Sequence, residues 1–130
     1  MKACKVEIVT FTEDGRSRFV ANGVLTEQED GFTAAYFAEG DRVRLVLSGR
    51  SLVMQRQGYN GLHVKFSPGV TGVMTLGIAE GTGSVPVSTE VCTVRRAKEG
   101  WRIALRYRLL FADVRIFRVN IAVSIISEEQ

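Results

Sequence analysis

The chain has 130 residues, the size of one domain that buries about two thirds of the surface of its unfolded chain. Hydrophobic residues make up 45% and charged residues 24%, which excludes a disordered chain, and no apolar run is long enough to span a bilayer. The net charge of +3 is uneven, with seven acids and four bases in residues 1–40 but eight bases and four acids in residues 92–130. We therefore expect a single domain over residues 1–130 with one basic side, which does not by itself make a nucleic-acid-binding protein.

Apolar residues recur at every second position along the chain, and the breaks between these runs hold Gly, Asp, Asn and Pro. The predicted strands are 4–12, 17–28, 31–39, 42–48, 51–58, 62–67, 72–79, 87–97, 101–111 and 114–127. Short connections favour antiparallel neighbours, and eight or more twisted strands commonly close so that no edge remains. The sequence therefore predicts an all-β protein, a single antiparallel meander that closes into a barrel of about 8–10 strands.

The N-terminal residues and the two cysteines indicate the cellular compartment. Lys5 and Glu7 interrupt its apolar residues, so it lacks the hydrophobic centre of a signal peptide. Cys4 and Cys92 are far apart in the sequence and would pair only if the fold brought them together. We expect a cytoplasmic protein with reduced cysteines, no membrane attachment, no metal and no cofactor.

The break after the fourth predicted strand suits a tight hairpin. Gly49 followed by Arg50 fits a two-residue type II′ turn, which fixes the register of the flanking strands. The resulting cross-strand pairs are Leu47 with Leu52, Leu45 with Met54, and Val43 with Arg56.

The next break, "GYNGL", allows two registers. A two-residue turn at Asn60 and Gly61 would set Phe66 opposite Gln55 and mix apolar with polar faces. A three-residue loop with Gly61 left-handed avoids this conflict, and we prefer it. It pairs Leu62, Val64 and Phe66 with Gly58, Arg56 and Met54.

Arg56 shares its face with apolar residues in either hairpin and is predicted to point into the barrel. An unpaired guanidinium there would be costly, so we expect a carboxylate or carbonyl partner for it. His63, the only histidine, falls on the outer face, which weakens any case for it as a catalytic base.

The stretch "WRIALRYRLLF" at 101–111 alternates between two faces. Trp101 and Tyr107 belong to the aromatic and aliphatic face, which we expect to build the interior. The other face carries Arg102, Arg106 and Arg108 and is predicted to form a basic outer surface.

Four segments, in this order, resemble the YwiB-like bacterial proteins, a family defined by a domain of unknown function. They are "VRLVLSGRSLVMQRQG" with Arg56 and Gly58, "GVMTLGIAE" at 72–80, "GWRIALRYRLLF" at 100–111, and "RVNIAVSI" with Asn120. The family's Thr-Pro-Tyr-Gly segment becomes "SPGVTG" here, without the tyrosine. The resemblance implies a calycin-type, lipocalin-like barrel that has room for a small ligand, and it implies no established ligand or reaction.

No set of residues supports an enzyme. The glycine-rich "GIAEGTGSV" has no Lys-Ser/Thr after it and is typical of a turn. A hydrolytic triad would have to use His63, and no nucleophile elbow is present. The acidic clusters lie beside turns and are predicted to be solvated; they are Glu13, Asp14, Glu27, Glu29 and Asp30. We predict no catalytic residues and no metal ligands.

Two functions stay open. The first is a non-catalytic module that binds a small amphipathic or anionic molecule in the barrel, and its predicted ligand-binding residues are Arg56, Tyr107, Trp101, Met54, Phe66 and Met74. The alternative is a barrel filled by side chains, with Arg56 in a structural contact and an outer face around Arg102, Arg106 and Arg108 that binds an acidic macromolecule. Nucleic acid is not favoured, since the aromatic residues that would stack on bases face inward. The outward Leu110, Val46 and Val53 would suit a homodimer contact.

Overall fold

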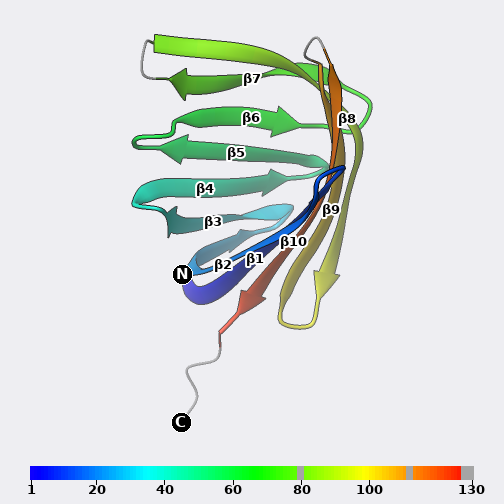
Figure 1. The fold of residues 1–130 in the computed structure, drawn as a ribbon. Coiled ribbons are helices and arrows are strands. Elements are labelled where there is room, and N and C mark those ends of the chain that lie inside the picture. Colours follow the sequence, from blue (N-terminus) through cyan, green and yellow to red (C-terminus); the bar gives the residue numbers. More distant parts are fainter. Residues whose placement is uncertain (79–80, 111–112, 127–130) are drawn as a thin grey trace.

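The computed structural model describes residues 1–78, 81–110 and 113–126. The ten strands are β1 (Lys2–Thr12), β2 (Gly15–Gln28), β3 (Gly31–Ala38), β4 (Asp41–Ser48), β5 (Ser51–Gln57), β6 (Leu62–Phe66), β7 (Thr71–Ile78), β8 (Gly81–Ala97), β9 (Gly100–Leu110) and β10 (Val114–Ile125). Each strand pairs antiparallel with its neighbours in the chain, and β1 pairs with β10 to close the barrel (Figure 1). The predicted all-β antiparallel barrel is therefore confirmed. Among the described residues, no helix is long and apolar enough to cross a membrane.

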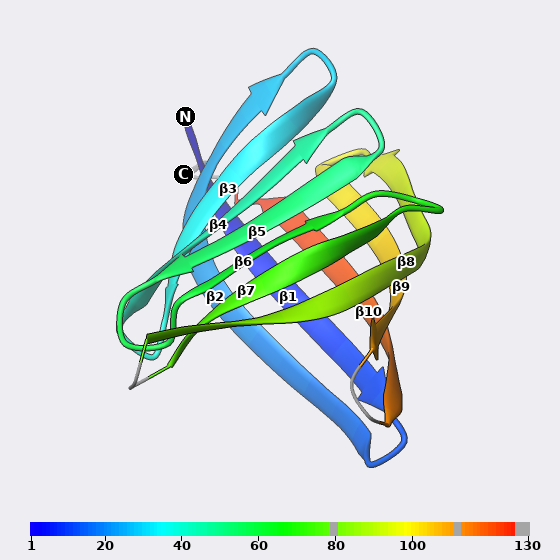
Figure 2. The same ribbon diagram turned by 90° about the horizontal axis from the view of Figure 1, so that it is seen from above.

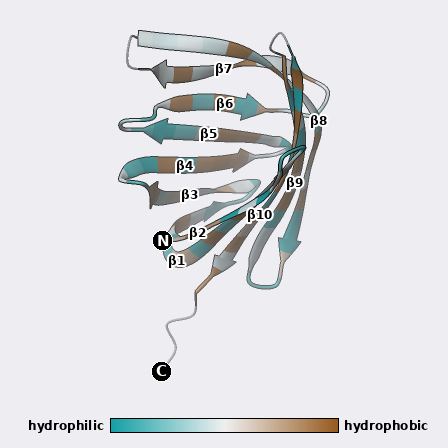
Figure 3. Ribbon diagram, in the orientation of Figure 1, coloured by the Kyte–Doolittle hydropathy of each residue, from teal (hydrophilic) through white to brown (hydrophobic). Residues whose placement is uncertain are grey.

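The hydrophobic core lies inside the barrel. In Figure 1, β3 to β7 run across the molecule and β8, β9, β10 and β1 run steeply beside them; Figure 2 shows the same strands from above. Brown and teal alternate along several strands in Figure 3, as expected where one face is buried and the other is wet. The fully buried side chains include Leu25, Phe32, Leu45, Leu52 and Val123.

The register of the β4–β5 hairpin is the predicted one. Leu47 lies opposite Leu52, and Val43 lies opposite Arg56. Gly49 adopts a φ of 61°, a conformation that glycine reaches without steric cost. The two-residue turn therefore sets which face of both strands is buried.

The predicted register of the next hairpin is wrong by two residues. Arg56 lies opposite Leu62 rather than Val64, so that the connection between paired residues spans 57–61. The prediction of which side chains face inward is still correct, because a shift of two residues keeps every side chain on its own side of the sheet. The longer loop is held from outside the hairpin, because the Asp41 carboxylate accepts hydrogen bonds from the backbone of Tyr59 and Asn60.

The eighth strand begins at Gly81, six residues earlier than the predicted 87. The added residues include Pro86, which cannot donate a backbone hydrogen bond. In the structure Pro86 lies opposite Val73 of β7, while pairing with β9 begins only at Val87. Proline is tolerated at Pro86 because the strand has a single partner at that point.

One end of the barrel, which carries the β2–β3 turn, is closed by side chains. The rings of Phe32 and Trp101 lie 5.2 Å apart, and the Arg96 guanidinium lies 4.9 Å from the centre of the Trp101 ring. Glu27 accepts hydrogen bonds from Lys2 Nζ at 2.7 Å and from Arg96 Nη2 and Trp101 Nε1 at 3.0 Å each. Glu27 was predicted to lie in a solvated turn, and this is corrected: its carboxylate points inward over Trp101 because Glu27 shares the inward parity of Leu25.

Candidate functional site

The opposite end of the barrel, which carries the β3–β4 and β5–β6 turns, is the candidate site. Inward-facing apolar side chains there stay partly exposed, and we call them the mouth residues. They are Ile8, Phe19, Ala21, Met54, Leu62, Leu76, Tyr107, Leu109 and Phe117. Met54 is the clearest case, because its cross-strand neighbours Leu45 and Val64 are buried. Met54 is thus partly exposed although it lies on the same face as two buried residues.

Aromatic rings occupy part of this interior. The Tyr107 ring stacks on Phe117 with the ring centres 5.2 Å apart and contacts Phe66 at 4.7 Å. Phe19 packs against Tyr36 with their ring centres 5.7 Å apart. Aromatic side chains that pack on one another thus supply much of the apolar surface at this end of the barrel.

Two tyrosine hydroxyls near the mouth have no hydrogen-bonding partner within the described part of the chain. Burial raises the pKa of Tyr36 to about 12, and the Arg56 charge opposes this rise. Burial likewise raises the pKa of Tyr107 to about 12. Both phenols are therefore neutral at physiological pH and can donate to an acceptor inside the barrel.

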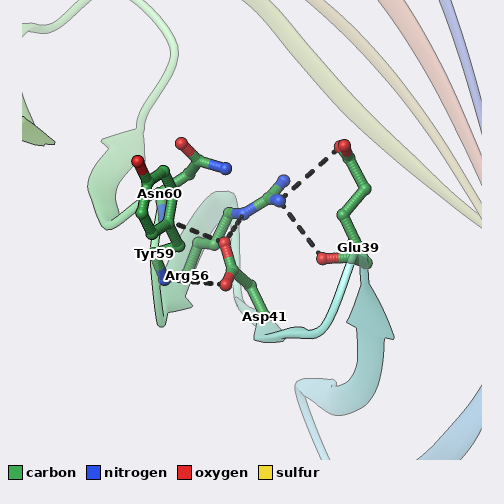
Figure 4. Close-up of polar contacts among 6 residues, drawn as sticks. Glu39, Asp41, Arg56, Tyr59 and Asn60 are labelled. Carbon is green, nitrogen blue, oxygen red and sulfur yellow. Dashed lines mark hydrogen bonds and ion pairs between the residues drawn. The ribbon is translucent and has the colours of Figure 1, made fainter.

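Arg56 sits at the rim of the mouth with a carboxylate and a carbonyl as partners, the two kinds expected from the sequence. Its Nε donates to Asp41 Oδ2 at 2.8 Å, and its Nη2 donates to the Ala38 carbonyl at 3.2 Å. The Glu39 carboxylate lies 3.8 Å from Nη2. Figure 4 shows the guanidinium between Asp41 and the β3–β4 turn. The positive charge of Arg56 is thus balanced within the protein.

Asp41 is the acceptor at the centre of this cluster. Besides Arg56, its carboxylate accepts the backbone N–H groups of Tyr59 at 2.8 Å and Asn60 at 3.0 Å. The hydrogen bond from Arg56, followed by that from Asn60, lowers the pKa of Asp41. Asp41 is only 4% exposed, and its ionised form is well supplied with donors.

Gly58 makes room for this carboxylate. A Cβ atom at Gly58 would lie 2.1 Å from Asp41 Oδ1, and the φ of 141° is one that other residues rarely adopt. The Arg56 and Gly58 of the segment "RQG" therefore act on the same partner, since one binds Asp41 and the other leaves space for it. This shared contact with Asp41 explains why an arginine and a glycine stand two residues apart in this segment.

The predicted ligand-binding residues all face inward but do not form one set. Met54 and Tyr107 are mouth residues, and Arg56 lies at the rim. Phe66 and Met74 are buried in the core. Trp101 lies at the closed end over Glu27. Alternation predicts the face of each residue but not its depth along the barrel, and therefore Tyr36 and Asp41 were missed.

Groups that could perform chemistry lie away from the mouth. His63 is exposed on the outer face, as predicted, opposite Gln55 and Thr75. Cys4 and Cys92 are free and buried, and desolvation raises the pKa of both thiols. The described residues include no group of three or more His, Cys, Asp or Glu side chains placed to hold a metal ion.

The outer face of β9 carries the predicted basic residues. Arg102 and Arg108 are exposed, and Arg106 is partly exposed. Glu90 accepts a hydrogen bond from Arg108 Nε at 2.5 Å and lies 3.7 Å from Arg106 Nε. Arg95 also faces outward, whereas Arg96 turns over Trp101 at the closed end.

Comparison with known proteins places the chain in a family. Residues 5–122 match the family model described as "Domain of unknown function (DUF1934)". The chain belongs to this family. The DUF1934 match runs from β1 into β10 and includes Arg56, Gly58 and Asp41. No curated protein matches the chain.

A solved structure has the same fold. The crystal structure of the YwiB protein from Bacillus subtilis is similar with a TM-score of 0.82 and 15% sequence identity, over 97% of this chain and 93% of that chain. Together with the DUF1934 match, this confirms the resemblance to the YwiB-like family seen in the sequence. At this identity the likeness shows the fold alone.

Proposed function

We propose that the chain is a non-catalytic module that binds a small amphipathic molecule inside the β3–β4 end of the barrel. The partial exposure of Met54 carries this proposal, because solvent reaches an inward-facing side chain whose cross-strand neighbours are buried. Ligand sites are commonly apolar concavities with a few polar groups, and barrel mouths are a frequent place for them.

The polar groups at the mouth indicate what part of the ligand they would hold. Tyr36 and Tyr107 offer neutral hydroxyls, since burial raises the already high pKa of each phenol to about 12. Asp41 and Glu39 offset the charge of Arg56. A hydrogen-bond acceptor such as a carbonyl, ether or hydroxyl oxygen therefore suits this rim better than a free anion does.

The character of the nucleophilic residues supports binding rather than catalysis. A buried thiol with a raised pKa is a poor nucleophile, and Cys4 and Cys92 are both of this kind. The exposed His63 lies on the other side of the wall from the mouth. Two free thiols are also in keeping with a cytoplasmic setting.

An uncharged fluorescent probe tests the proposal. N-phenyl-1-naphthylamine, which brightens in apolar surroundings, is titrated into the wild-type chain and into Met54→Trp, where the indole would fill the mouth. Val53→Trp is the matched control, because Val53 is the next residue of β5 and faces outward between Val46 and Lys65. Native mass spectrometry counts the probe molecules bound to each chain.

We expect saturable binding of one probe per chain in the wild type and in Val53→Trp, and a loss of at least about tenfold in affinity in Met54→Trp. Circular dichroism shows whether each variant keeps its strands. No saturable binding by the wild type would overturn the proposal. Equal binding by a folded Met54→Trp would overturn it as well.

A further inference from the structure

The outer faces of β8, β9, β10 and β1 form a regular grid of side chains. Antiparallel pairing aligns outward residues of the four strands into three rows that cross the strands. The first row is Arg95, Arg102, Ala122 and Glu7; the middle row is Thr93, Ala104, Asn120 and Val9; the third row is Val91, Arg106, Arg118 and Phe11. The middle row holds only short side chains, whereas a pair of arginines stands in the row on each side of it.

This difference in length makes a trough across the barrel wall. A hollow of about 390 Å³ lies between the first and middle rows, and one of about 410 Å³ lies between the middle and third rows. The two hollows share Ala104 and Asn120 and therefore lie next to each other. We call the three rows together the arginine trough.

The arginines of the trough face each other without enough acids to balance them. Arg95 lies directly opposite Arg102, and Arg106 lies directly opposite Arg118. Like charges in such cross-strand positions repel each other. Among the described residues, neither Arg95, Arg102 nor Arg118 forms an ion pair.

Two acids, Glu7 in the first row and Glu90 beside the third, are already engaged. Arg18 Nε donates a hydrogen bond to Glu7, and Arg108 Nε donates one to Glu90. The nearby positive charges of Arg18, Lys5 and Arg102 contribute to the lowered pKa of Glu7. The trough therefore has positive walls and would be relieved by carboxylates brought from outside.

We propose that the arginine trough binds an acidic amphipathic helix of a partner protein. Arg102 and Arg106 are four residues apart on β9, so the walls stand about 14 Å apart, while a helix with its side chains is about 10–12 Å wide. Four strands span about 14 Å across the barrel, the length of about ten helical residues. Val9 and Ala104 of the middle row would accept an apolar stripe, and the arginines of the two outer rows would accept flanking glutamates.

The same features argue against a nucleic acid. Bases of a single strand need free aromatic faces on which to stack. Phe11 is the aromatic ring of the trough, and the Arg118 guanidinium covers it at 5.4 Å from the ring centre. A phosphate backbone would also leave Val9 and Ala104 without an apolar partner.

Fluorescence anisotropy with three labelled probes tests the proposal at about 0.15 M salt. The first is a synthetic peptide of about 18 residues, with a leucine stripe flanked by glutamates when helical. The second is the same composition in scrambled order, and the third is a single-stranded oligonucleotide of equal charge. The variants are Arg95→Glu with Arg102→Glu, Ala104→Phe, and a control pair, Arg42→Glu with Arg44→Glu. The control makes the same change in net charge on the exposed face of β4.

We expect the amphipathic peptide to bind at least about tenfold more tightly than either comparison probe. The trough charge reversal and Ala104→Phe should each weaken it about tenfold or more, and the β4 control should change it less than about threefold. Tighter binding of the oligonucleotide would overturn the proposal. So would equal binding of the scrambled peptide, equal effects of the two charge reversals, or no binding of the amphipathic peptide.

Discussion

The Arg56 guanidinium and the Asp41 carboxylate hold two hairpins together at the rim of the barrel. Nε donates to Oδ2 at 2.8 Å, Asp41 begins β4, and Arg56 lies near the end of β5. The same carboxylate holds the backbone of Tyr59 in the β5–β6 turn. The contact therefore fixes the relative position of two neighbouring turns.

Gly58→Ala should destabilise the protein by about 2–3 kcal/mol, because it combines a strained φ with a clash against Asp41. Gly15→Ala is the matched control, since Gly15 has a φ of 133° but nothing within 4 Å of a built Cβ atom. Strain alone should cost about 1 kcal/mol there. Urea unfolding of both variants gives the two free energies. Equal losses of unfolding free energy in the two variants would mean that Asp41 moves away from the added methyl group without a measurable cost in stability.

The Asp41–Arg56 pair should also shape the acid stability. The pKa of Asp41 is lowered in the folded state, so its contribution to stability is fully present above the unfolded value of about 3.9 and is lost as the pH falls through the lower folded value. Asp41→Asn should therefore be less stable than the wild type near neutral pH, and the difference should shrink in acid. Urea unfolding at several pH values measures this, with Asp14→Asn in the exposed β1–β2 turn as the control. A difference independent of pH would contradict the assignment.

Glu39→Asn should stabilise the protein by about 1 kcal/mol. Within the described residues, Glu39 is the one non-glycine with a positive φ, 52°, and Gly40 follows it with a φ of 84°. Asn-Gly is the preferred pair for such a type I′ turn. The lost ion pair with Arg56 matters little, because its atoms are 3.8 Å apart and Glu39 is exposed. A melting temperature that falls would show that the ion pair outweighs the strain; Glu29→Asn, in the β2–β3 turn, should leave it unchanged.

Cys4 and Cys92 should react slowly with a thiol reagent in the folded protein. Both are buried and free, and burial raises the pKa of each thiol, so little thiolate is present at about pH 8. Labelling should be more than about 100-fold slower than in urea, because it needs local opening. With an aromatic disulfide reagent, each reacting thiol releases a coloured thiolate, and its absorbance measures the rate of labelling. A rapid phase for one thiol in the native protein would place that cysteine in a part of the barrel that opens readily.

The two hairpins on either side of β5 show where sequence reasoning holds and where it stops. The Gly49–Arg50 turn is decided by its own residues, so its register follows from local turn chemistry. The β5–β6 loop is decided by Asp41, which lies in another hairpin and captures the backbone of Tyr59 and Asn60. No local pattern contains that partner, and the predicted register was therefore short by two residues.

The candidate site, too, was predictable from the sequence only in part. Alternation along β5 places Arg56 inside and requires a carboxylate or carbonyl partner, and both are present. The identity of Asp41 and the depth of Trp101 depend on how far each strand is staggered around the barrel, which a one-dimensional pattern does not contain. The opposed arginines of the trough likewise appear only when the registers of β8, β9 and β10 are known.

The pairing of β1 with β10 has a consequence for synthesis on the ribosome. These strands lie near opposite ends of the sequence, and eight residue pairs join them, from Cys4 with Ile125 to Phe11 with Arg118. Because β1 leaves the exit tunnel before β10, it must wait for β10 before this seam can form. Until then β1 and the growing sheet present unpaired edges, the kind of surface that chaperones cover and that aggregates recruit.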